Sequence, residues 1–157
     1  MTYQVSLDAT VAADPSIFNL NAVSADTVLD TDQGKALACD VATMHRLRVV
    51  GGGFSPIRWI WHLNMDREVL QQYPDLQPVR LNKGILAPNV PSRDTHLSPQ
   101  TMIWTDETCD AFSVYGAAHM FGDLVDQANP AEDAKYVVIA LSRPTMFLAD
   151  GMWVSCG

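Results

Sequence analysis

The sequence predicts a single domain with an all-β fold, and three observations lead to that prediction. Short runs of β-branched and aromatic residues recur between Gly, Pro, Asn and Asp residues. Long stretches with a helical period of apolar residues are scarce. The chain has 157 residues, which suits one compact domain with a buried core and is too short for two full-sized domains. We therefore expect antiparallel strands arranged in a sandwich or in a closed, coiled sheet.

Eight segments have the length and composition of strands. They are residues 3–7, 27–30, 47–50, 54–62, 79–81, 101–105, 136–141 and 145–148. Three consecutive glycines, Gly51, Gly52 and Gly53, separate two of these segments and predict a hairpin turn. A phosphate-binding loop is not expected there, because no Lys-Ser or Lys-Thr pair follows and no long helix begins.

Two short segments are expected to be helices inserted between strands. Residues 66–73 open with an acidic residue and stop at Pro74. Residues 117–128 stop before Asn129-Pro130. The predicted fold class is therefore all-β with one or two short helices.

The composition argues against several classes of partner and site. Ten basic and eighteen acidic residues give a net charge of −8, and the basic residues are scattered, so nucleic acid is not an expected partner. No basic, apolar leader and no run of eighteen apolar residues is present, so we expect a soluble chain without a signal peptide or transmembrane segment. No compartment is indicated.

The cysteines and histidines predict neither a metal site nor a disulfide framework. Cys39, Cys109 and Cys156 are odd in number and widely spaced, and we expect them to be buried free thiols. No two of the four histidines have the spacing of zinc ligands. We expect no metal and no cofactor.

Trp59 and Trp61 flank Ile60 in the predicted strand 54–62. We expect the two indoles to lie on opposite faces, so that one enters the core and the other is exposed beside Arg58 and His62. An exposed aromatic side chain in that place would be a contact for a protein partner. The alternative is a strand that is covered on both faces within one domain.

A series of motifs carries a resemblance to a known family. The motifs are GGFSPIRWI at 52–60, QPVRL at 77–81, KGIL at 83–86, PNVPSRD at 88–94 and LSPQ at 97–100. In order and in spacing they resemble the Pro-Val-Arg-Trp-Ile, Pro-Val-Arg, Gly-Ala-Leu, Leu-Pro-x-Arg-Asp and Leu-Ser-Pro-x-His motifs of bacterial Hedgehog/intein (Hint) domains. Positions between 25 and 34 and the LADG of 148–151 extend the resemblance to about residues 22–151.

The resemblance implies a horseshoe-shaped all-β fold whose first residue sits in a central cleft. It places the start of the Hint-like domain at Ala22, so that residues 22–157 form the domain. Residues 1–21 precede it and correspond to the segment that such a domain cuts away from itself.

Self-cleavage in this family begins when a thiol or hydroxyl on the first residue attacks the carbonyl of the residue before it. That position is Ala22 here, and alanine has no nucleophilic atom. Ser24 is the nearest hydroxyl, but its use would require a register slip of two residues.

The family also needs an acid that protonates the leaving nitrogen, a role that the resemblance gives to the His of Ser-Pro-x-His. Thr101 stands at that position, three residues after Ser98, and a threonine hydroxyl does not exchange protons near neutral pH as imidazole does. Two further histidine positions near the C-terminus are occupied by Val138 and Pro144.

We therefore hypothesise a catalytically inactive Hint-like module that acts in binding or assembly, with a protein partner or with further copies of itself. It would be a structural component of a larger assembly such as a phage-like particle. The alternative is a self-cleaving domain whose nucleophilic Cys was replaced by Ala at position 22. A third hypothesis is a small-molecule binder that uses the vacated cleft, with Ala22, Ser98, Thr101 and Val138 as its lining.

Overall fold

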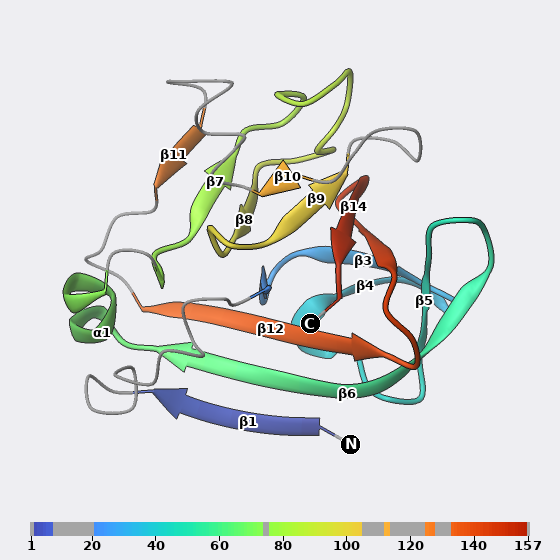
Figure 1. The fold of residues 1–157 in the computed structure, drawn as a ribbon, viewed down its shortest axis with the longest axis horizontal. Coiled ribbons are helices and arrows are strands. Elements are labelled where there is room, and N and C mark those ends of the chain that lie inside the picture. The colour runs from blue at the N-terminus through green and yellow to red at the C-terminus, as the bar shows by residue number, and fades with distance from the viewer. Residues whose placement is uncertain are drawn as a thin grey trace.

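The strands form one curled sheet (Figure 1) in the computed structural model, which describes residues 2–7, 21–73, 76–104, 112–113, 125–127 and 133–156. The all-β prediction is confirmed. The strands are β1 Thr2–Leu7, β2 Val23–Ser24, β3 Val28–Thr31, β4 Gly34–Leu37, β5 Arg46–Arg48, β6 Phe54–Met65, β7 Val79–Leu81, β8 Thr95–Leu97, β9 Met102–Trp104, β10 Phe112–Ser113, β11 Val125–Gln127, β12 Ala134–Leu141, β13 Met146–Ala149 and β14 Met152–Ser155. The helices are α1 Arg67–Gln72 and a 3-10 turn at Ala38–Asp40.

The long strand β6 organises the sheet. It pairs antiparallel with β5 near its start and antiparallel with β12 along most of its length. On the edge opposite β12 it pairs with β1, and this pairing is parallel (Figure 1). Gly51, Gly52 and Gly53 connect β5 to β6 with φ of +88°, +97° and +77°, a conformation that favours glycine, so the predicted hairpin turn is confirmed.

Two hydrophobic clusters lie on the two faces of the β6–β12 pair. Alternate residues of β12 belong to different clusters, Val137 and Ile139 to one, and Tyr136 and Val138 to the other. This follows from the two-residue period of a strand. The larger cluster joins β3, β5, β13 and β14, whereas the smaller one packs Ala22 and the helix α1 against the sheet.

The first predicted helix is confirmed and has a clear N-terminal cap. The Asp66 side chain accepts a hydrogen bond from the Val69 N–H at 3.0 Å, which satisfies one of the free amides of the first turn. Val69 and Leu70 are buried in the smaller cluster, and the Tyr136 hydroxyl donates to the Leu76 carbonyl at 2.7 Å just beyond the helix.

The second predicted helix, residues 117–128, lies mostly outside the described residues. Within it, Val125–Gln127 form strand β11 and pair antiparallel with β7, so the prediction is wrong for these three residues. Pairing with an available sheet edge outweighs a short helical pattern, because helix propensity is a weak preference.

The expectation for the two tryptophans is also wrong. Residues two apart in a strand share a face, and the rings of Trp59 and Trp61 lie 4.8 Å apart on the same side of β6. Trp59 packs against the smaller cluster, and Trp61 is 40% exposed.

The cysteine expectation needs correction where the structure describes it. Cys39 is exposed and Cys156 is partly exposed, and both are free thiols, whereas Cys109 lies outside the described residues. In the described part of the chain, no helix has the length and apolar character needed to cross a membrane. No group of three or more His, Cys, Asp or Glu residues is placed to hold a metal ion among these same residues.

Candidate functional site

The backbone of Ala22 is held by the hydroxyls of Ser98 and Thr101. The Ala22 N–H donates to Thr101 Oγ1 at 3.0 Å and to Ser98 Oγ at 3.3 Å. Thr101 Oγ1 donates its proton to the Ala22 carbonyl at 3.1 Å, and the Ser98 N–H donates to the same carbonyl at 3.0 Å. The two hydroxyls also contact each other, with Ser98 Oγ and Thr101 Oγ1 2.7 Å apart.

The local sequence explains how these segments meet. Val23 of β2 is the register partner of Leu97 in β8, which brings the chain after β8 beside Ala22. The Thr101 N–H then donates to the Ser98 carbonyl at 3.1 Å and closes a turn that presents both hydroxyls to Ala22. Ala22, Ser98 and Thr101 are 2%, 1% and 0% exposed, so these hydrogen bonds are made away from water.

Asn21, on the other side of the junction, was not predicted to take part. Its Oδ1 accepts a hydrogen bond from the Met102 N–H at 3.1 Å. The residues on both sides of the Asn21–Ala22 bond are thus fixed to the segment 98–102. The contact joins residues 81 positions apart, and no sequence pattern indicates it.

The remaining predicted positions lie in different environments. Val138 is buried in the same cluster as Ala22. Pro144 is exposed in the turn between β12 and β13, outside that cluster. The Ser24 hydroxyl contacts Asp26 Oδ1 at 2.6 Å and Thr27 Oγ1 at 3.0 Å, so its described partners lie on its own turn and not at the junction.

The arrangement at Ala22 has a direct chemical meaning. If the Asn21–Ala22 bond were cut, the Ala22 nitrogen would be the leaving group, and it would need a proton. The groups that accept the hydrogen bond of that nitrogen are the Thr101 and Ser98 hydroxyl oxygens. Thr101 Oγ1 therefore lies beside the nitrogen that would need the proton, and its own proton is directed at the Ala22 carbonyl.

A buried carboxylate, Asp150, joins two of the motifs. It is 4% exposed and accepts hydrogen bonds from the Val28 N–H at 3.2 Å and the Thr95 hydroxyl at 2.8 Å. Arg93 lies 3.9 Å from it and also contacts Asp26 at 3.5 Å. These contacts connect the 88–94 and 148–151 motifs, and a cavity of about 250 Å³ opens beside them.

We expect Asp150 to make stability depend on pH. Burial raises the pKa of Asp150, although Thr95, Val28 and Arg93 each oppose the shift. Between the ordinary carboxyl pKa of about 3.9 and the raised value, the folded chain holds this proton more tightly than the unfolded chain. The contribution of Asp150 to the free energy of unfolding therefore falls as pH rises through that interval.

Urea unfolding of the parent chain and of Asp150→Asn across acidic to neutral pH measures this contribution. The free energy of unfolding of the parent minus that of the variant should decrease as pH rises above about 4. A difference that is constant with pH would contradict the assigned shift.

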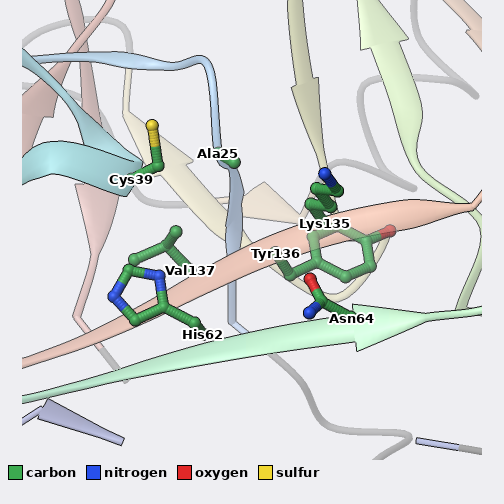
Figure 2. A pocket seen from close by; sticks show the side chains of 7 residues that line it. All are labelled: Ala25, Cys39, His62, Asn64, Lys135, Tyr136 and Val137. Atoms are coloured by element: carbon green, nitrogen blue, oxygen red, sulfur yellow. The ribbon is translucent and has the colours of Figure 1, made fainter. Parts of the chain in front are cut away.

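A second cavity of about 190 Å³ lies over the face of β6 and β12 that carries His62 and Lys135 (Figure 2). Its lining residues are Ala25, Cys39, His62, Asn64, Lys135, Tyr136 and Val137. Partial desolvation, although Cys39 is largely exposed, and the neighbouring Asp40 carboxylate raise the pKa of the Cys39 thiol, which disfavours the reactive thiolate. In Figure 2 the Cys39 sulfur points away from the His62 ring, so the two do not form a thiol–imidazole pair.

Comparison with known proteins agrees with this fold. A model of the Hint domain family matches residues 22–156. Crystal structures of the gp41-1 intein and of a variant with three substitutions each superpose with a TM-score of 0.55 at 9% sequence identity. The superpositions cover 88% of this chain and 99% or 100% of theirs, and at this identity they show the fold alone. No curated protein sequence matches the chain.

Proposed function

The chain belongs to the Hint domain family, and we propose that its Hint domain does not cut the Asn21–Ala22 bond and instead serves as a scaffold for protein binding or assembly. The hydrogen bond between the Ala22 nitrogen and the Thr101 hydroxyl carries the first part of this proposal. Cleavage would release this nitrogen, and Thr101 is a hydroxyl that accepts its hydrogen bond.

The first argument concerns the nucleophile. An acyl shift needs a thiol or hydroxyl on the residue after the bond that is cut, and Ala22 supplies only a methyl group. The described partners of the Ser24 hydroxyl are Asp26 and Thr27, so it does not replace the missing group.

The second argument concerns the proton. A general acid must lose and regain its proton near the operating pH, and a threonine hydroxyl does neither. The Ser98 hydroxyl, which contacts Thr101 Oγ1 at 2.7 Å, does not titrate near neutral pH either. The two hydroxyls and the Ala22 peptide group form one hydrogen-bonded network, and this network supports a structural role for these residues.

A binding role is supported by two exposed aromatic side chains on β6. Phe54 is 47% exposed and Trp61 is 40% exposed, and aromatic residues are enriched at the centres of protein interfaces. The partner we propose is a protein, either a further copy of the chain or another component of a larger particle such as a phage-like structure. A purified chain that stays monomeric in light scattering and binds no such component would contradict this part.

The cleavage part is tested by intact mass spectrometry of three chains, the parent, Ala22→Cys and Ala22→Cys/Thr101→His, with and without a thiol at neutral pH. We expect the parent to keep full mass because Ala22 has no nucleophile. We expect Ala22→Cys to keep full mass because no acid is present to protonate the Ala22 nitrogen as it leaves. Circular dichroism of each chain checks that the larger His side chain has not unfolded the domain.

The alternative function is self-cleavage blocked only at position 22. One observation favours it: Asn21 and Ala22, on either side of the bond that would be cut, are both hydrogen-bonded to the segment 98–102. Appearance of fragments 1–21 and 22–157 from Ala22→Cys alone would establish this alternative and overturn the proposal. The small-molecule hypothesis receives no such support. The hydroxyls of Ser98 and Thr101, which would have to contact the ligand, are hydrogen-bonded to each other and to Ala22.

A further inference from the structure

The strand β1 lies outside the part of the chain that matches the Hint family. The family match begins at residue 22, whereas β1 spans Thr2–Leu7, within the segment that self-cleavage would remove. β1 is nevertheless a member of the sheet, since it pairs with β6 in six consecutive register positions (Figure 1).

Among the described strands, β1 is the one that pairs with this edge of β6 along Ile60–Met65. β12 occupies one edge of β6, and β1 occupies the other along Ile60–Met65. A strand edge without a partner exposes a row of backbone N–H and C=O groups that readily pair with another extended segment. This is the geometry that proteins use when they bind a peptide by adding a strand to a sheet.

The register also matches apolar positions with apolar positions. Tyr3, Val5 and Leu7 are the register partners of Trp61, Leu63 and Met65. Leu63 and Met65 are buried in the smaller hydrophobic cluster. The intervening positions of β1 are the polar residues Thr2, Gln4 and Ser6. The apolar positions of β1 are therefore the ones that pair with the β6 residues of the smaller cluster's face.

We propose that the β6 edge over Ile60–Met65 is a strand-binding site, which takes a parallel extended segment with apolar residues at alternate positions. Its occupant is the chain's own segment Thr2–Leu7. This segment stays on the domain through its pairing with β6, whether or not the Asn21–Ala22 bond is intact. The inference is therefore independent of the proposed loss of cleavage.

Residues 8–20 connect β1 to the junction, and thirteen residues can span about 40 Å when extended. A connection of this length keeps β1 near the edge at an effective concentration of the order of millimolar. The site should therefore bind the same segment supplied as a separate peptide only when its own strand is displaced.

Two variants of the full chain provide a matched test, because each adds one negative charge to β1. Val5→Asp places the charge at the position paired with Leu63, which is 6% exposed. Gln4→Asp places it at the position paired with His62, which is partly exposed. A carboxylate beside a buried apolar register partner is strongly unfavourable, so only Val5→Asp should release β1.

Hydrogen exchange of the Ile60–Met65 amides and binding of a fluorescent peptide of residues 1–8 are the readouts. Val5→Asp should speed exchange at some of these amides by about 10-fold or more, and it should bind the peptide at least about 10-fold more tightly than the parent or Gln4→Asp does. Unchanged exchange at Leu29 would show that the domain core is intact. Equal exchange at the β6 edge in all three chains, or equal or no peptide binding by all three, would overturn the proposal.

Discussion

Replacing Leu29 by Ala is expected to lower the free energy of unfolding by about 3–4 kcal/mol, because the substitution removes a fully buried side chain and leaves a cavity. Leu29 is 0% exposed and lies in the larger hydrophobic cluster. Its register partners on both sides are alanines, Ala36 in β4 and Ala149 in β13. These small neighbours cannot extend into the space, so the cavity should stay open. Equilibrium unfolding in urea measures the change.

The matched control is Leu37→Ala in the same β3–β4 hairpin. Leu37 is 38% exposed, and its register partner is Val28. The same atoms are removed, but much of their surface already contacts water, so the expected loss is below about 1 kcal/mol. Equal losses at the two positions would show that Leu29 does not occupy the core as described.

Thr101→Val is expected to cost about 2–3 kcal/mol of unfolding free energy, although the two side chains have nearly the same shape. The hydroxyl that it removes accepts from the Ala22 N–H, donates to the Ala22 carbonyl and contacts Ser98. After the change, the buried Ala22 amide keeps only the 3.3 Å contact with Ser98. An incompletely satisfied buried donor accounts for most of the cost.

A double-mutant cycle with Ser98→Ala measures the coupling free energy between the hydroxyls of Ser98 and Thr101. Ser98 and Thr101 share the Ala22 N–H and contact each other at 2.7 Å, so the two substitutions should not be additive. Urea unfolding of the two single variants and the double variant should give a coupling free energy of about 1 kcal/mol. Strict additivity would mean that the two hydroxyls act independently and that they do not form one hydrogen-bonded network with Ala22.

These two predictions concern different parts of the fold. Leu29 tests the larger hydrophobic cluster, whereas Thr101 tests what the hydroxyl pair at the Asn21–Ala22 junction contributes to stability. A large loss at Thr101 would support the proposal that the hydroxyl pair stabilises the junction.

The sequence by itself determined the features whose signals are local. Each of the eight predicted strands has a counterpart, because alternating β-branched and aromatic residues indicate a strand without reference to the rest of the chain. The Gly51–Gly53 turn and the Asp66 cap are local for the same reason. The motifs around Ala22, Ser98 and Thr101 also follow one another in order, and this was sufficient to identify the three residues that the structure brings together.

Only the tertiary structure decided the features that depend on distant partners. The strands β2, β4, β8 and β14 are two to four residues long and form through pairing with neighbouring strands. Asn21 and Asp150 find their partners across the fold, and the exposure of Cys39 depends on what packs around it. The pairing of β1 with β6 belongs here too, since no local pattern specifies which edge a strand will cover. The sequence carries short-range preferences for strands and turns. Long-range pairing depends on which backbone groups still need hydrogen-bond partners and which apolar faces still need to be buried as the sheet assembles.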